Sequence, residues 1–168
     1  MSPPKTARRA CFYAGEDYDM SASVGHLLSK VMSSMRREAD SRMAALDLTD
    51  AQWKPLWMLR CGRADTAFEL AREMDVDAGA MTRTLDRLEA KGLIERVRSE
   101  TDRRVVHLRL TPEGDRASAE VPHVLAEVNN DHLQGFSKSE WTLLRDLLQR
   151  MLDNGEALRA AAAKEQDK

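Results

Sequence analysis

The sequence predicts a mainly α-helical fold with one small β-hairpin, and three features of the chain support this prediction. Apolar residues recur at three- and four-residue spacing in several long stretches, which is the pattern of amphipathic helices. Cap-forming residues stand immediately before several of these stretches. One pair of short segments instead alternates apolar and polar residues around a polar turn, as hairpin strands do.

Length and composition limit the classes of protein to consider. A chain of 168 residues fits one domain, with or without an extension for assembly. Aromatic residues make up 5% and charged residues 32%, which favours a helical, heavily solvated protein. No apolar run approaches the roughly 18 residues of a membrane span, and the basic N-terminus lacks the apolar stretch of a secretory signal. Two cysteines, Cys11 and Cys61, are too few for a disulfide framework, so we expect a cytoplasmic protein without a membrane partner.

The N-terminal part predicts an irregular arm followed by a long helix. Residues 1–20 show no periodicity. The helix is expected from about Ser21 to Ala45. Its apolar stripe consists of Val24, Leu27, Leu28, Val31, Met32, Met35, Ala39 and Met43.

Three short helices are expected next, within about forty residues, which is the size of a helix-turn-helix core. Residues 49–52 and 66–69 both match the capping box that opens a helix. Asp77 is the expected cap of the third, and Gly92 follows its end. Pro55 lies inside the first of the three, where it removes a backbone donor and should distort the turn.

A hairpin follows, with strands expected at 94–98 and 105–110 and a polar turn between them. The alternation predicts that Val106, Leu108 and Leu110 point inward and that Val105, His107 and Arg109 point outward. Arginines stand at the turn. A hairpin with a basic tip directly after a helix-turn-helix is a wing.

Two further helices end the chain. Thr111-Pro112 predicts a helix start, and this helix is expected to run to about His132 with a bend at Pro122. Residues 137–140 form another capping box, which opens a last helix with the stripe Trp141, Leu144, Leu148, Met151 and Leu152. The first helix and the last two have no partner inside a three-helix core, so we expect a second copy of the chain to bury them.

The charge is unevenly distributed, although the net charge of −2 argues against a generally basic nucleic-acid surface. Residues 83–109 hold eight positive and five negative side chains, a local excess of +3. Residues 64–79 hold one positive and five negative side chains, a local balance of −4. A solvated surface is the plainer interpretation of such runs. Arginine predominates over lysine in the basic block, which favours contacts to phosphates and base edges.

Four segments resemble the MarR family of winged-helix transcription factors. Asp102-Arg103-Arg104, followed after five residues by Leu110-Thr111, matches its D-x-R-x5-L-T signature. Residues 48–59 (LTDAQWKPLWML), 82–96 (TRTLDRLEAKGLIER) and 111–114 (TPEG) match as well. The resemblance covers roughly residues 24–152, and the wing and the C-terminal half are most similar to the branch that represses multidrug-efflux operons.

The resemblance implies a winged helix-turn-helix DNA-binding domain at 48–110 and dimerisation helices at 21–47 and 111–163. It also implies a homodimer that binds a pseudo-palindromic operator in double-stranded DNA. Small, often phenolic or aromatic-acid, ligands would relieve repression. One departure concerns residues 77–80 (DAGA), which replace the more usual Ser/Asn-rich opening of the recognition helix and leave fewer side chains to read bases.

The expected DNA contacts lie on the outer side of the recognition helix and at the wing tip: Ala78, Gly79, Thr82, Arg83, Arg87, Arg103 and Arg104. Asp102 is expected to shape the turn and orient an arginine rather than touch DNA. The alternative for Arg83 and Arg87 is that they pair with Asp86, Glu89 or Asp102.

The expected effector pocket follows from the resemblance, since members of the family bind small aromatic acids where the dimerisation helices meet the DNA-binding lobe. The candidates are His26, Ser29, Lys30, Met32, Trp53, Trp57 and Arg60. A carboxylate favours Arg, Lys or His, and an aromatic ring favours Trp or Met. The alternative for each residue is an ordinary place in the core or on the surface.

Two alternative functions are compatible with the sequence. Cys11 follows two arginines that would lower the pKa of its thiol, which makes a redox-sensing regulator one alternative. A protein-interaction module on the same fold is another. The chain has no phosphate loop, nucleophile elbow or HExxH, so we expect neither an enzyme nor a cofactor. Its four histidines show no i,i+4 pair and no CxxC companion, so no metal site is expected.

Overall fold

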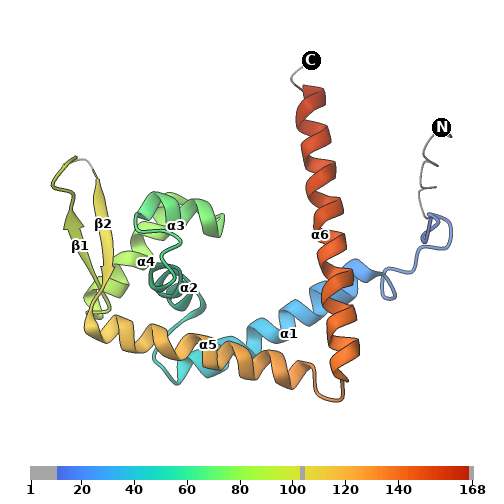
Figure 1. Ribbon diagram of the computed structural model, residues 1–168, viewed down its shortest axis with the longest axis horizontal. Coiled ribbons are helices and arrows are strands. Elements are labelled where there is room, and N and C mark those ends of the chain that lie inside the picture. Colours follow the sequence, from blue (N-terminus) through green and yellow to red (C-terminus); the bar gives the residue numbers. More distant parts are fainter. Residues whose placement is uncertain (1–10, 103–104, 167–168) are drawn as a thin grey trace, which may run out of the picture. The chain divides into compact units, whose positions relative to one another are not determined.

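The computed structural model describes residues 11–102 and 105–166, and over these residues it contains six helices and one antiparallel two-stranded sheet (Figure 1). This confirms the predicted mainly α fold with a single hairpin. The elements are α1 (Val24–Ala44), α2 (Asp50–Arg60), α3 (Ala67–Met74), α4 (Ala78–Ala90), β1 (Ile94–Arg98), β2 (Val106–Leu110), α5 (Pro112–His132) and α6 (Lys138–Gln166). The chain forms two compact units that divide between Val124 and Leu125.

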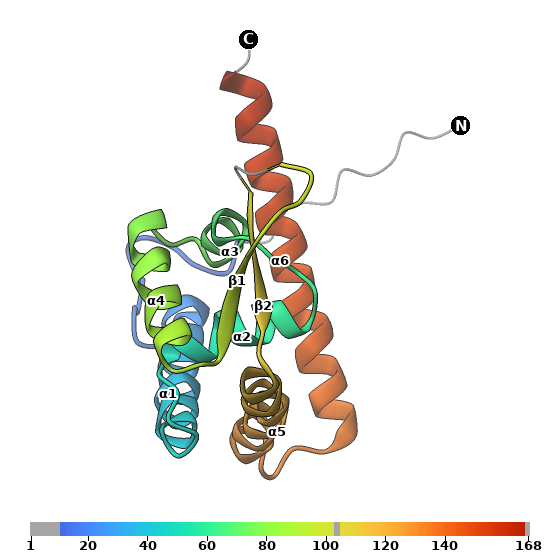
Figure 2. The same ribbon diagram turned by 90° about the vertical axis from the view of Figure 1, so that its left-hand side faces the viewer.

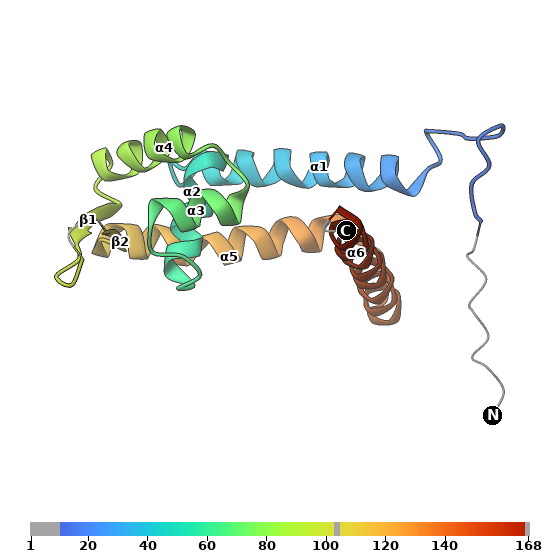
Figure 3. The ribbon, with the colours of Figure 1, turned by 90° about the horizontal axis from the view of Figure 1, so that it is seen from above.

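Helix α1 starts three residues later than expected because Ser23 caps it. The Ser23 hydroxyl accepts from the His26 backbone N–H at 3.2 Å and donates to the Met20 carbonyl at 2.8 Å. The Tyr13 hydroxyl of the arm accepts from the Val24 backbone N–H at 3.0 Å. Only Ala39 and Met43 of α1 are buried, and its N-terminal half extends beyond the short helices (Figure 3).

The cap signals of the short helices are confirmed. The Thr49 backbone N–H donates to Gln52 Oε1 at 3.2 Å, and Thr66 Oγ1 accepts from the Glu69 backbone N–H at 3.2 Å. The Asp77 carboxylate caps α4 by accepting from the Ala80 backbone N–H at 3.0 Å. The expected distortion at Pro55 does not interrupt the helix: α2 continues through this residue, whose ring is buried in the core.

The core of the first unit gathers the inward faces of the three short helices. Leu56 of α2, Leu70 of α3, and Met81, Leu85 and Leu88 of α4 are all buried. Ile94 and Leu108 of the hairpin close the same core. In Figure 2, which looks onto the hairpin, β1 lies between α4 and β2. Helix α4 and the hairpin therefore share one apolar core.

The hairpin pairs Ile94 with Leu110 at its base and Arg98 with Val106 at its outer end. Strand β2 starts one residue later than expected, and Leu108 is buried as predicted. Val106 lies on the same side of the strand as Leu108 but is 38% exposed, so the expected inward row is not buried along its whole length. Val106 pairs with Arg98 at the outer end of the hairpin, which projects past the helices (Figure 1).

The C-terminal helices keep the predicted starts. Helix α5 runs through Pro122 to His132 without a break. The capping box before α6 is complete, since Ser137 Oγ accepts from the Glu140 backbone N–H at 3.3 Å and Glu140 Oε2 accepts from the Ser137 backbone N–H at 2.8 Å. Many large apolar side chains of α6 are exposed: Trp141, Leu143, Leu147, Met151, Leu152 and Leu158. None of the described helices is both long and apolar enough to span a membrane.

One tight backbone junction joins α4, the hairpin and α5. The Thr111 hydroxyl donates to the Gly92 carbonyl at 2.6 Å, and the Thr111 backbone N–H donates to the Leu93 carbonyl at 3.1 Å. Gly114 packs so closely that a Cβ atom there would lie 1.8 Å from the Leu93 carbonyl oxygen. Only glycine fits at this position.

We predict that Gly114→Ala destabilises the protein by at least about 3 kcal/mol, because backbone rather than a flexible side chain blocks the added methyl group. Urea denaturation followed by circular dichroism measures this change. Gly155→Ala is the matched control, since a Cβ at this helical glycine meets nothing within 4 Å. We expect it to raise the stability by about 0.5–1 kcal/mol. Equal stabilities of the two variants would contradict the proposed junction.

Candidate nucleic-acid interface

The outward face of α4 carries the five helix residues predicted to contact DNA. Ala78, Gly79, Thr82, Arg83 and Arg87 are all exposed, whereas Met81, Leu85 and Leu88 face the core. A helix that buries one stripe must present the opposite one to solvent, so periodicity alone placed these residues together.

The first turn of α4 carries small side chains, and a side-chain hydrogen bond lies within it. The Thr82 hydroxyl donates to the Ala78 carbonyl at 2.8 Å. A Cβ on Gly79 would lie 3.0 Å from Asp77 Oδ1 and 3.7 Å from Arg83 Nη1. The Arg83 guanidinium therefore lies near the helix N-terminus, where small side chains allow close approach of a ligand.

Two carboxylates on α4 are engaged by Arg96 of β1. The distance from Arg96 Nη2 to Asp86 Oδ1 is 2.7 Å, and Arg96 Nη1 also pairs with Glu89. The hydrogen bond to Asp86 raises the pKa of the Arg96 guanidinium. Among the residues that the structure describes, none forms an ion pair with Arg83 or Arg87. The alternative in which Asp86 or Glu89 neutralises these two arginines is therefore not what the structure shows.

The hairpin is anchored to the turn before α3. The Asp65 carbonyl accepts from the Leu108 backbone N–H at 2.7 Å, and Asp65 Oδ2 lies 3.0 Å from His107 Nδ1. Glu69 Oε2 in turn accepts from the Asp65 backbone N–H at 3.0 Å. That hydrogen bond lowers the pKa of the Glu69 carboxyl.

Arg103 and Arg104, predicted at the wing tip, lie outside the described residues. The turn before them is held by Ser99, whose backbone N–H donates to the Val105 carbonyl at 3.0 Å. The Asp102 backbone N–H donates to Ser99 Oγ at 3.3 Å, and its carbonyl accepts from the Val105 backbone N–H at 2.9 Å. Asp102 thus takes part in the turn through its backbone.

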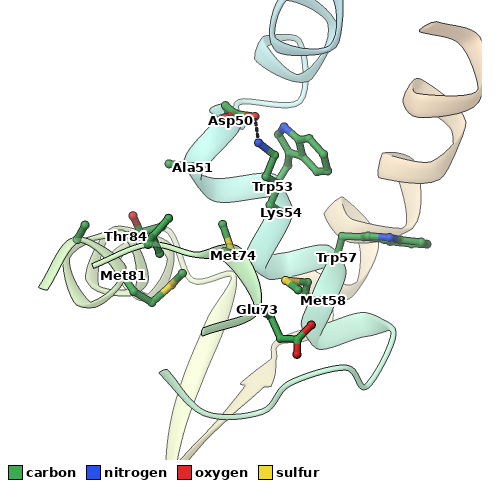
Figure 4. Close-up of a pocket in the computed structure, with 12 residues that line it drawn as sticks. Asp50, Ala51, Trp53, Lys54, Trp57, Met58, Glu73, Met74, Met81 and Thr84 are labelled. Atoms are coloured by element: carbon green, nitrogen blue, oxygen red, sulfur yellow. Dashed lines mark ion pairs between the residues drawn. The ribbon is translucent and has the colours of Figure 1, made fainter. Parts of the chain in front are cut away.

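A pocket of about 550 Å³ opens between α2, α3 and α4 (Figure 4). Met58, Met74 and Met81 point towards the space between α2 and α4. The other residues that line the pocket are Asp50, Ala51, Trp53, Lys54, Trp57, Glu73, Val76, Ala80 and Thr84.

Of the seven predicted effector residues, only Trp53 and Trp57 line this pocket. Arg60 instead joins α2 to α5, with Nη1 2.9 Å from the Asp115 carbonyl oxygen and 2.5 Å from Asp115 Oδ1. The α1 candidates His26, Ser29, Lys30 and Met32 contribute nothing to its wall.

Both cysteines are exposed, and the Cys11 thiol lies 3.5 Å from the Tyr13 carbonyl oxygen. The two arginines before Cys11 lie outside the described residues. No cluster of three metal-ligating side chains occurs within residues 11–102 and 105–166.

Comparison with known proteins identifies the family. The MarR family model matches residues 48–106. The multiple antibiotic resistance protein MarR of Escherichia coli (strain K12) is 34% identical over 131 residues, covering 77% of this chain and 90% of that protein. The chain belongs to the MarR family.

Solved structures of MarR-family proteins agree with this assignment. A mutant of E. coli MarR complexed with operator DNA aligns with a TM-score of 0.69 and 30% identity, covering 80% of this chain and 99% of that one. BpsR of Bordetella bronchiseptica, whose DNA binding is regulated by 6-hydroxynicotinic acid, aligns with a TM-score of 0.68 and 26% identity. The alignment covers 81% of this chain and 97% of the BpsR chain. The family consists of regulators, in agreement with the prediction that this chain is not an enzyme.

The structure of this MarR-family protein also shows contacts near the outward face of α4 and the hairpin that the sequence did not indicate. Arg96 belongs to the basic block and Asp65 to the acidic run, and neither pattern indicates the partner that each has in the structure. Arg96 lies ten residues from Asp86 and on a different element, so no helical spacing rule connects the two. The Thr66-to-Glu69 capping box was the one available signal for the position of Glu69.

We predict that Glu69→Gln weakens the pH dependence of stability in this MarR-family protein. Because folding lowers the pKa of Glu69, its carboxylate stabilises the fold fully above its unfolded pKa. That contribution is lost as the pH falls through the lower, folded pKa. Urea denaturation at about pH 6 and about pH 3 should show a smaller loss of stability for the variant than for the wild type. Identical losses would exclude this role of Glu69.

Proposed function

We propose that this MarR-family protein is a transcriptional repressor in the cytoplasm. It binds a pseudo-palindromic operator as a homodimer and is released by a small aromatic or phenolic acid. The observation that carries the proposal is the outward face of α4, where Arg83 and Arg87 are exposed while Arg96 engages the neighbouring carboxylates. The E. coli MarR structure with operator DNA, which has the same fold, supports this assignment.

Each α4 residue suits a particular contact in a major groove. Ala78 and Gly79 let the backbone approach the DNA, and Thr82 offers a methyl group and lone pairs to a base edge. Arg83 projects near the helix N-terminus, where it can form two hydrogen bonds with a guanine. Arg87 lies one turn further along and contacts phosphate.

The wing adds contacts outside the major groove. Arg103 and Arg104 would reach an adjacent minor groove or its phosphates, as arginines at narrow grooves do. Asp102 would orient one of them. The anchor between β2 and Asp65 supports this proposal, because it holds the middle of β2 beside the turn that precedes α3.

The homodimer is proposed from unpartnered apolar side chains. Val24, Leu27, Val31 and Met32 of α1 are between 41% and 56% exposed, and α6 exposes a further row. Such faces ordinarily mark an interface. A two-fold dimer would place its recognition helices about 34 Å apart, in successive major grooves.

The effector is proposed to bind near α1 and α2. The regulation of BpsR by an aromatic acid supports this ligand class. The proposed residues are His26, Ser29, Lys30, Met32, Trp53, Trp57 and Arg60. Ligand binding would shift the population towards dimers with the wrong spacing for DNA.

Fluorescence anisotropy on DNA from the protein's own promoter tests the proposal, with a scrambled duplex and a single half-site as controls. We expect specific binding that requires both half-sites and falls steeply with salt. Salicylate should then weaken it. Loss of binding with peroxide instead of salicylate would favour a redox sensor based on Cys11, and equal binding to scrambled DNA would favour an interaction module without DNA specificity.

We predict different consequences for two arginine substitutions. Arg104→Ala should weaken binding to specific and scrambled DNA alike and reduce the salt slope by about 1, since it removes one phosphate contact. Arg83→Ala should cost about 1–3 kcal/mol on the operator and relax base preference. Wild-type behaviour of both variants would refute this binding face.

We also predict that Arg96→Gln weakens operator binding about tenfold, because Asp86 and Glu89 then face Arg83, Arg87 and the phosphates without a partner. The triple variant Arg96→Gln/Asp86→Asn/Glu89→Gln should recover most of the affinity in the same anisotropy assay. Failure of this rescue would mean that Arg96 acts in another way, for example by touching DNA.

A further inference from the structure

The pocket between α2, α3 and α4 has a chemistry that the proposed effector site does not explain. Its floor is apolar and polarizable, because Met58, Met74 and Met81 converge there (Figure 4). Methionine sulfur makes favourable contacts with aromatic rings and adapts to their shape. At about 550 Å³, the space lies within the range of small-molecule sites.

The charged side chains of the wall are unfavourable for an anion. They are Asp50, Lys54 and Glu73, two negative groups and one positive. Lys54 Nζ lies 2.7 Å from Asp50 Oδ1, so the only cation of the wall already has a carboxylate partner. A ligand carboxylate would have to break this pair and would then meet two negative charges.

A cation finds a complementary group, Glu73, at the same wall. The Glu73 side chain is 35% exposed, and its closest cationic neighbour, Arg72 Nη2, lies 3.9 Å away on the same helix.

We propose that this pocket is a second ligand site, distinct from that for aromatic acids, and that it takes a planar aromatic cation. The ring lies on the methionine floor, and the positive charge is held by Glu73. Met81 of the floor and Thr82 of the DNA-facing side are successive residues of α4. A ligand in the pocket therefore rests against the recognition helix, and its effect on DNA depends on the proposed function.

Two naphthalene compounds of similar shape and opposite charge test the site by isothermal titration calorimetry on the full chain without DNA. At neutral pH, 2-naphthylmethylammonium should bind at least about tenfold more tightly than 2-naphthoate. Tighter binding of naphthoate, equal binding, or no binding of the cation overturns the proposal.

Variants locate the binding. Glu73→Gln should reduce the preference for the cation at least about fivefold, the scale of one partly screened charge. Ala51→Phe, which fills the pocket from its exposed α2 side, should abolish binding of both compounds. Glu120→Gln removes an exposed carboxylate of α5 outside the pocket and should bind like the wild type. Wild-type preference in Glu73→Gln, or wild-type binding in Ala51→Phe, overturns the assignment.

Anisotropy on operator DNA separates this inference from the proposed function. A protein that binds the operator but does not prefer the cation refutes the pocket and leaves the regulator intact. A protein that binds the cation through Glu73 but has no DNA preference keeps the pocket and refutes the regulator.

Discussion

The contact between Gly114 and the Leu93 carbonyl sets the relative position of the parts that would meet DNA. It brings the first turn of α5 against the link between α4 and β1 at a distance that no side chain permits. Thr111 closes the junction by bonding to the Gly92 and Leu93 carbonyls. The hairpin leaves the core at this point, so its direction relative to α4 depends on backbone atoms rather than on adaptable side chains. A relaxed junction would move both the wing and the helix that carries the exposed arginines.

Internal pairing of carboxylates explains how a chain of net charge −2 presents a basic surface. Asp86 and Glu89 are paired with Arg96. In the acidic run, Asp77 caps α4, Asp65 holds His107, and Glu69 accepts from a backbone N–H. These carboxylates serve local structure, and the exposed arginines of α4 determine the field on the outward face. The distribution of partners, rather than the net charge, therefore decides what this face can bind.

The two faces of helix α4 differ in their surroundings. Met81 faces the pocket and the core, whereas Thr82 and Arg83 face outward. Since packed interiors resist continuous deformation, a ligand that wedges against the inner face would move the helix as a unit. A change of about one ångström at the pocket would then reach the DNA-facing side without a longer chain of contacts.

The sequence by itself determined the order and the starts of the elements, because caps, periodicity and turns act through neighbours along the chain. The caps at Asp77 and Ser137, the hairpin, and the exposed positions of Thr82 and Arg83 were all predictable in this way. Tertiary structure decided which charges meet. It paired Arg96 with α4, joined Arg60 to α5, exposed Val106 beyond the core, and separated the α1 candidates from the tryptophan-lined pocket. These outcomes depend on contacts between segments that are distant in the sequence. Local spacing along the chain does not indicate which distant side chain will lie in contact with a given residue.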